Sequence, residues 1–210
     1  MPTWEIENTY NGIVCGIDEA GRGPWVGQVV AGAVVFLNKN IEPEWLQNLN
    51  DSKKLSAAKR EKLYDLLLSE EKKGKICCGI GMASAQEIDE LNILQATFLA
   101  MSRAAEKLRI KPQFALIDGN RLPKQFLCQT ACYISGDARS YSIAAASILA
   151  KVYRDRLLKE LAQKYPFYGF EKNAGYGTKD HIAGIREHGL ISEHRKSYKP
   201  IKNFMETGQI

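Results

Sequence analysis

The chain has 210 residues, 45% hydrophobic and 25% charged, which is enough for one large domain with its own core. The net charge of +5 is uneven: residues 139–210 carry 13 Lys and Arg against 7 Asp and Glu, whereas the preceding residues carry 16 against 17. A near-neutral body followed by a basic segment suits binding of a polyanion. The longest apolar stretch, residues 26–37, is too short and glycine-rich to span a membrane, and residues 1–10 lack the basic start of a signal peptide.

The first half of the chain predicts three strands and three helices. We expect strands at 13–17, 26–36 and 75–82, and helices at 56–69, 84–91 and 93–108. The first two strands are close enough to pair as a hairpin. Ser56 is a suitable N-cap, Ser84 and Glu87 have the spacing of a capping box, and Asn92 interrupts the helical pattern.

The second half alternates strands and helices. We expect strands at 114–117 and 132–135, helices at about 142–164 and 178–188, a loop at 165–176, and a basic, polar segment at 190–210 with weak order at its end. Small residues at 143–147 allow the long helix to approach a sheet closely. Three consecutive strands followed by alternation predict a mixed sheet flanked by helices.

The five cysteines are odd in number and scattered, with no Cys-x-x-Cys pair. This pattern argues against structural zinc. Free thiols in apolar runs behave as small hydrophobic side chains, and we therefore expect a reduced, cytoplasmic protein.

Two adjacent carboxylates, Asp18 and Glu19, follow the first predicted strand. Side chains alternate along a strand, so we expect the strand to end here and let both acids turn toward one point. Gly21 and Gly23 supply backbone freedom, and Arg22 between them suggests a cradle of N–H groups and a guanidinium for a phosphate. An ordinary turn with solvated charges is the simpler alternative.

Four acids stand at predicted strand ends rather than on helix surfaces: Asp18, Glu19, Asp118 and Asp137. Ligand sites of α/β sheets lie beyond such ends, so we expect the four to converge. Their repulsion then requires divalent cations such as Mg²⁺ or Mn²⁺, and two ions can activate water and stabilise a leaving oxygen. Asp155 is a rival fourth ligand, but it lies far along a helix at a spacing that favours pairing with Lys151 or Lys159.

The run from Asp18 to Pro24 resembles the opening motif of type 2 ribonuclease H, ribonuclease HII. Residues 117–120, Asp137 and the helix start at 142–151 resemble its other motifs, and the similarity extends from about residue 12 to 200. The resemblance implies an α/β fold, a ribonuclease H-like mixed sheet flanked by helices with a helical C-terminal portion. We expect a catalytic core at 1–165 and a substrate-binding portion at 166–210, in one continuous domain.

The same resemblance implies a metal-dependent endonuclease that cuts the RNA strand of RNA–DNA hybrids. It also implies incision of duplex DNA on the 5′ side of single ribonucleotides, leaving 3′-hydroxyl and 5′-phosphate ends, in ribonucleotide excision repair and RNA primer removal. The implied catalytic and metal-binding residues are Asp18, Glu19, Asp118 and Asp137. The implied substrate-binding residues are Gly21, Arg22, Gly23, Ser52, Lys53 and Tyr176, with the 2′-hydroxyl as the distinguishing group.

Several assignments stay open from the residues alone. Tyr168 is the alternative to Tyr176, and Lys151 and Arg154 are further candidates for phosphate contact. The roles of His181 and His194 are undefined. We expect a monomer without membrane contact, and residues 203–210 are a weak candidate for binding a sliding clamp.

Two other functions compete with the nuclease. A phosphatase with an aspartate nucleophile needs Asp-x-Asp at the first strand end, where this chain has Asp18-Glu19-Ala20. A non-catalytic nucleic-acid-binding module has no use for four acids that repel phosphate. Both alternatives are therefore disfavoured.

Overall fold

A five-stranded mixed sheet forms the centre of the molecule. The computed structural model describes residues 1–38, 44–49, 52 and 55–210. The strands are β1 (Val14–Ala20), β2 (Val29–Phe36), β3 (Ile76–Ala83), β4 (Phe114–Asp118) and β5 (Gln129–Tyr133). Their order is β3-β2-β1-β4-β5, with β1–β2 and β2–β3 antiparallel and β1–β4 and β4–β5 parallel. This arrangement confirms the predicted mixed sheet, although β5 begins and ends earlier than expected.

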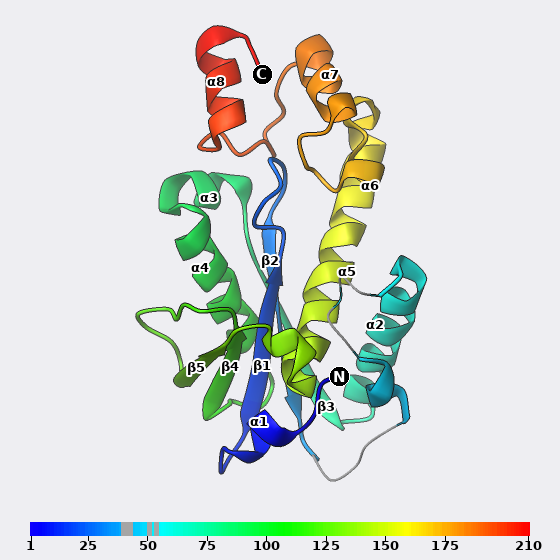
Figure 1. The fold of residues 1–210 in the computed structure, drawn as a ribbon, viewed down its shortest axis with the longest axis vertical. Coiled ribbons are helices and arrows are strands. Elements are labelled where there is room, and N and C mark those ends of the chain that lie inside the picture. The colour runs from blue at the N-terminus through cyan, green and yellow to red at the C-terminus, as the bar shows by residue number, and fades with distance from the viewer. Residues whose placement is uncertain (39–43, 50–51, 53–54) are drawn as a thin grey trace.

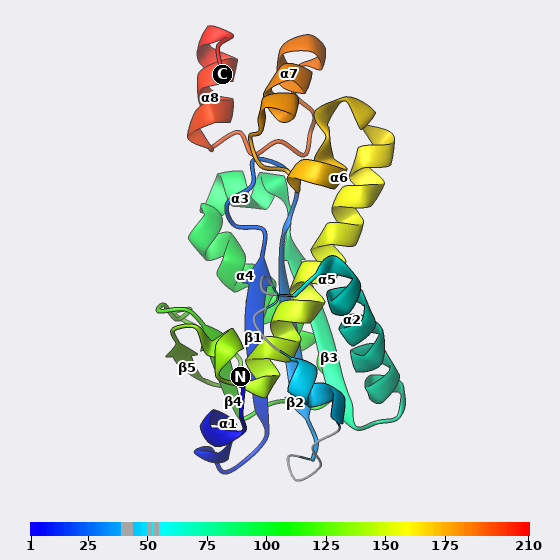
Figure 2. The same ribbon diagram turned by 45° about the vertical axis from the view of Figure 1, so that its right-hand side comes forward.

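Helices cover both faces of the sheet (Figures 1 and 2). On one face, α4 (Ile93–Glu106) packs across β2 and β3, next to α3 (Ala85–Leu91). On the other face, α5 (Tyr141–Lys164) crosses β1 and β2, and α2 (Ala57–Lys72) packs against it. Two apolar clusters result, one under each layer of helices.

Small residues allow α5 to lie directly on the sheet. A side chain at Gly16 would place its Cβ 2.1 Å from the carbonyl carbon of Ser142, and one at Gly32 would lie 2.4 Å from the Ala146 oxygen. The close packing predicted from the small residues at 143–147 is therefore confirmed. The short N-terminal helix α1 (Glu5–Asn8) secures the start of α5, since buried Glu7 accepts hydrogen bonds from the Ser142 N–H and the Ser140 hydroxyl.

The predicted helix boundaries hold where a polar side chain caps the helix. Ser56 accepts from the Lys59 N–H, and Ser84 and Glu87 form the expected reciprocal capping box. Asn92 ends α3 with a left-handed φ of +69° and caps α4. Such local interactions depend on residues within one turn, so the sequence is sufficient to predict them.

The C-terminal residues form a separate apolar cluster beyond the far end of β1 and β2 (Figure 1). The predicted loop at 165–176 contains a 3₁₀ turn at 166–168 and the helical turn α6 (Phe170–Asn173). The helix α7 (Lys179–His188) begins after Thr178 and ends at Gly189 as expected. The weak order expected at the end of this segment is wrong as far as Thr207, because α8 (Lys199–Thr207) forms there and buries Ile201.

Some short elements have no counterpart among the elements expected from the sequence: α1 and the 3₁₀ turns Glu44–Asn48 and Gly136–Ala138. Each has five residues or fewer, too few for a periodic pattern. No helix within the described ranges has the length and apolar character needed to cross a membrane. The five cysteines are unpaired.

Candidate active site

The first two acids lie inside β1 rather than beyond its end. Strand β1 continues to Ala20, and Asp18 and Glu19 pair with Gly32 and Ala31 of β2. The expectation that the strand ends at Asp18 is therefore wrong on the β2 side. On the other side, the β1–β4 register stops at Ile17 and Ile117. The two strands separate at the level of the acids, and this separation gives the carboxylates room.

Hydrogen bonds hold Asp18 and Asp118 in place and connect the end of β4 to the turn before α5. Asp118, the last residue of β4, accepts from the Gly136 N–H at 2.7 Å and so holds the turn that carries Asp137. Asp18 accepts from the Glu19 N–H at 2.7 Å. Asp18 and Asp137 are 7% and 8% exposed, whereas Glu19 and Asp118 are half-buried. The predicted acids are thus brought together from β1, β4 and the turn before α5.

This arrangement has an electrostatic cost at Asp18. Its pKa lies well above the ordinary value, first because burial disfavours the charged form, then because of the negative charges of Glu19, Asp118 and Asp137. The charges of the other three carboxylates therefore reach Asp18. A nearby cation would remove this penalty.

Oxygen donors of this kind suit hard divalent cations. Among the residues that the structure describes, no three His, Cys, Asp or Glu side chains are gathered into a ready-made coordination group. The acids share one electrostatic neighbourhood without forming a closed ligand shell. The donor set fits Mg²⁺ or Mn²⁺ in its chemistry.

A small pocket of about 80 Å³ opens beside the acids. Glu19, Arg22 and Asp118 line it together with side chains of α4. The Arg22 guanidinium lies 3.3 Å from the Glu19 carboxylate. A larger cavity of about 500 Å³ lies between α5 and the start of α3 and includes none of the four acids. A polymeric substrate does not require a deep pocket, so we assign the chemistry to the acids.

The predicted recognition residues Gly23 and Tyr176 are in contact. A Cβ at Gly23 would lie 3.2 Å from the Tyr176 ring, which is 53% exposed. Tyr168 is instead 2% exposed, stacks on Phe170 and donates its hydroxyl to the Gly189 carbonyl. Tyr168 is therefore a packing residue, and Tyr176 is the tyrosine available to a ligand.

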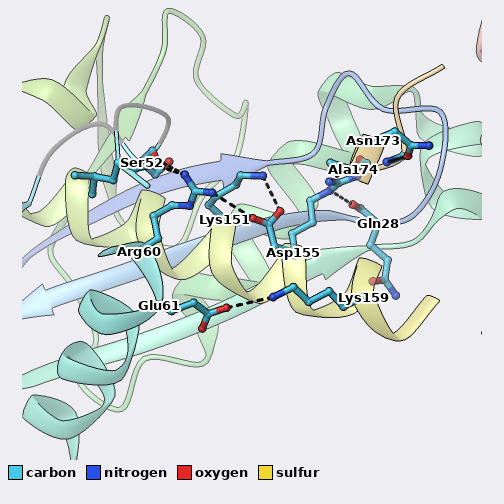
Figure 3. A network of polar contacts seen from close by, with 12 residues as sticks. Gln28, Ser52, Arg60, Glu61, Lys151, Asp155, Lys159, Asn173 and Ala174 are labelled. Carbon is cyan, nitrogen blue, oxygen red and sulfur yellow. Dashed lines mark hydrogen bonds and ion pairs between the residues drawn. The ribbon is translucent and has the colours of Figure 1, made fainter. Parts of the chain in front are cut away.

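Ser52 lies in a polar network between α2 and α5 (Figure 3). The Ser52 carbonyl accepts from Arg60 at 2.9 Å, and Arg60 lies 3.8 Å from Asp155. Asp155 also pairs with Lys151 at 2.6 Å, one of the two partners expected from helical spacing. Asp155 is thus an ion-pair residue of α5 and not a fourth member of the acid group. Lys53 lies outside the described residues.

Sequence reasoning missed the structural roles of two buried arginines. Arg154, a candidate for phosphate contact, is 3% exposed and donates to the carbonyls of Val26, Gln28 and Ala174. Arg195 is fully buried beneath the Gly21–Gly23 loop. Arginine is seldom buried, so no pattern in the sequence predicts these positions.

His181 and His194 form a second buried polar group. Their Nε2 atoms are 3.1 Å apart. His194 Nδ1 faces the Ile191 N–H at 3.0 Å, and His181 Nδ1 faces the Tyr176 carbonyl at 2.9 Å. One tautomer pair satisfies all three contacts: His194 accepts at Nδ1 and donates from Nε2, and His181 accepts at Nε2 and donates from Nδ1. Both rings must then be neutral.

This pair predicts a loss of stability in mild acid. Burial, and then the neighbouring His181, lower the pKa of His194 to about 4, whereas an unfolded histidine titrates near 6.5. The unfolded chain therefore binds more protons between these values, and the free energy of unfolding should fall by about 3 kcal/mol as pH drops from about 6.5 toward 4. Urea unfolding at several pH values measures this change in the free energy of unfolding. His194→Asn should flatten the dependence above pH 5, whereas His188→Gln, outside the pair, should leave it unchanged.

The sequence and the fold both identify a known class. Residues 15–201 match the family model described as Ribonuclease HII. A ribonuclease HII of Jannaschia sp. (strain CCS1) is 49% identical over 204 residues, covering 97% of this chain and 98% of that protein.

Two solved structures have the same fold. The ribonuclease H2 of Pyrococcus horikoshii OT3 is 30% identical, with a TM-score of 0.73 over 92% of this chain and 97% of that one. The ribonuclease HII of Archaeoglobus fulgidus, solved in a complex with PCNA, is 26% identical, with a TM-score of 0.67 over 89% of this chain and 95% of that one.

The mixed sheet, the flanking helices and the helical C-terminal part define a ribonuclease H-like enzyme. The chain belongs to the ribonuclease HII family. It is accordingly a type 2 ribonuclease H, an endonuclease with activity on RNA–DNA hybrids.

Proposed function

We propose that this ribonuclease HII also incises duplex DNA on the 5′ side of a single embedded ribonucleotide. The products carry 3′-hydroxyl and 5′-phosphate ends, and the activity serves ribonucleotide excision repair and RNA primer removal. The contact between the Gly23 backbone and the exposed Tyr176 ring carries this proposal. It lies on the loop that follows the acids of β1, so one recognised sugar can be placed beside the reactive phosphodiester.

Asp18, Glu19, Asp118 and Asp137 hold Mg²⁺ or Mn²⁺ in this proposal, with two ions in the substrate complex. Such ions, when bound, supply an activated water and stabilise the leaving oxygen. The mutual repulsion that raises the Asp18 pKa supports cation binding. Asp118 contributes positioning as well as charge, since its bond to the Gly136 N–H holds the turn that carries Asp137.

The remaining residues bind the nucleic acid around this centre. Arg22, whose side chain is half-exposed, and the exposed Tyr176 contact the ribonucleotide and its junction. Ser52, which is buried in the free protein, and Lys53 are assigned to phosphates in this proposal by the family resemblance alone. The basic residues at 166–210 extend the duplex-binding surface. Docking of residues 203–210 on a sliding clamp is a further part of the proposal, supported by the PCNA complex of the Archaeoglobus fulgidus protein and by Met205, which is 55% exposed.

A cleavage assay with three matched duplexes tests the proposal. One carries a single ribonucleotide, one is all DNA, and one is an RNA–DNA hybrid, each with Mg²⁺, Mn²⁺ or a chelator. We expect a cut on the 5′ side of the single ribonucleotide, no cut in all-DNA duplex, and loss of both reactions with chelator. Cleavage of the hybrid alone would refute incision at single ribonucleotides while leaving the family activity intact.

A further inference from the structure

Arg195 lies in the segment between α7 and α8. This segment meets the loop between β1 and β2 through the bridge of Val26 and His194, and the two segments lie side by side in Figure 1. The Arg195 side chain is fully buried. The guanidinium donates over 2.6–2.9 Å to five oxygens: the carbonyls of Gly21, Arg22, Pro24 and Gly27 and the hydroxyl of Tyr198. None of these acceptors is a carboxylate. A buried charge without a counter-charge is costly, and an apolar side chain would fill the same space more cheaply.

The effect of Arg195 on the loop follows from peptide geometry. In a planar trans peptide, the C=O of one residue and the N–H of the next point in opposite directions. The described residues contain no cis peptide bond. Because Arg195 holds the carbonyls of Gly21 and Arg22, the N–H groups of Arg22 and Gly23 point away from the protein interior.

The N–H groups of Arg22 and Gly23 lie beside Tyr176, the predicted recognition tyrosine. Within the described ranges, neither donates to a protein acceptor. The Tyr176 ring lies against Gly23, where a Cβ would approach it to 3.2 Å. Two adjacent donors next to an exposed ring form a surface suited to a sugar hydroxyl or a phosphate oxygen.

Arg154 supports the same loop from α5. It donates to the carbonyls of Val26 and Gln28 and, at 3.2 Å, to the carbonyl of Ala174, two residues before Tyr176. Gln28 and Ala174 lie close together along α5 (Figure 3). Arg154 therefore connects the β1–β2 loop, which carries Gly21 and Gly23, to the loop that carries Tyr176. Burial, and then the charge of Arg195, lower the pKa of Arg154 to about 10, so Arg154 stays charged at neutral pH.

The backbone around Arg195 is anchored to the core. Its N–H donates to the Trp25 carbonyl at 2.8 Å, and the Gly27 N–H donates to the Glu193 carbonyl at 2.9 Å. Asp89 of α3 accepts from the N–H groups of Lys196 and Ser197 at 2.9 and 2.8 Å. The C-terminal segment thus presents Arg195 to the loop from a fixed position.

We propose that Arg195 is a positioning residue for ribonucleotide recognition: its guanidinium turns the Arg22 and Gly23 N–H groups toward the 2′-hydroxyl side of the substrate. This inference rests on the proposed function, in which the loop reads a single ribonucleotide. Arg195 itself does not touch the substrate. It determines how well ribonucleotide is distinguished from deoxyribonucleotide, and contributes little to the sequence-independent attraction of DNA.

Binding measurements on an inactive enzyme separate the preference for a ribonucleotide from the general affinity for DNA. In an Asp118→Asn background with Mg²⁺, affinities are measured for duplex DNA with one ribonucleotide and for the same all-DNA duplex. Arg195→Lys keeps the charge but has three donors without the planar fork, so it cannot satisfy all five acceptors. We expect it to reduce the ribonucleotide preference about 10-fold, the scale of one or two lost hydrogen bonds, with all-DNA affinity nearly unchanged.

The matched control is Arg156→Lys, which alters an arginine on the same helix as Arg154 but in a surface ion pair with Glu61. It should leave the preference unchanged. If Arg195→Lys does not fold, Tyr198→Phe removes one acceptor of the guanidinium and should reduce the preference about 3-fold.

An unchanged preference in folded Arg195→Lys, or in Tyr198→Phe where the lysine variant does not fold, would overturn the positioning role. Absence of any ribonucleotide preference in the Asp118→Asn parent would instead refute the proposed function. The two failures are therefore distinguishable.

Discussion

Asp118→Asn is expected to reduce cleavage of RNA–DNA hybrid about 10³-fold or more while leaving the protein folded. Asn keeps an oxygen that can accept from the Gly136 N–H, so the turn that carries Asp137 stays in place. The change removes one negative charge from the proposed cation site. Loss of several kcal/mol of transition-state stabilisation corresponds to this reduction in rate.

The same substitution should not lower the stability of the metal-free protein. Asp118 is one of the charges that raise the Asp18 pKa, so its removal relieves repulsion in the folded state. We expect a free energy of unfolding equal to or slightly above that of the parent in chelator. Asp65→Asn, at a 70% exposed side chain on α2, is the matched control and should retain activity. Parent-like cleavage by Asp118→Asn would remove Asp118 from the catalytic group.

Gly21→Ala should have the second largest effect, because it strains the recognition loop in two ways. Gly21 has a φ of +96°, which an alanine adopts only at a cost of about 1 kcal/mol. A Cβ there would also lie 1.9 Å from the Arg154 Nε, so the loop or the buried guanidinium must move. Misplacement by about 1 Å can reduce catalysis about 10²-fold, and we expect a loss of this size with hybrid substrate.

Gly74→Ala separates backbone strain from steric displacement. Gly74 has a φ of +72° in the turn after α2, and a Cβ added there would meet no described atom within 4 Å. It should lose about 1 kcal/mol of stability and keep full activity. Steady-state cleavage and urea unfolding of both variants measure the difference. Equal activity of the two would show that the position of the Gly21 loop does not control catalysis.

The helix starts illustrate what short-range chemistry determines. Ser56 and Ser84 cap their helices as predicted, and Asn92 interrupts the helical pattern as predicted, because each interacts with N–H groups two or three residues away. The helix α8 has no side-chain N-cap of this kind, but Pro200 lies in its first turn and Gly208 ends it. It is short, and burial of Ile201 against the C-terminal cluster contributes to its stability.

The candidate acids could be selected from the sequence because strand ends and carboxylates are both visible in it. In the structure, the charges of Glu19, Asp118 and Asp137 all act on Asp18. The sequence suggested that β1 ends at Asp18. The structure shows instead that β1 and β4 separate there while β1 and β2 remain paired, a difference that depends on the register between strands.

The sequence by itself determined the mixed sheet, most helix boundaries, the four candidate acids and the choice of Tyr176 as a candidate, through periodicity, capping residues and motif resemblance. Only the tertiary structure decided which charged residues are buried. Arg195 lies 174 residues from Gly21, and the two meet because the C-terminal segment folds back over the β1–β2 loop. A buried guanidinium is stabilised by the sum of many distant carbonyl acceptors, and such a set exists only after the chain has folded.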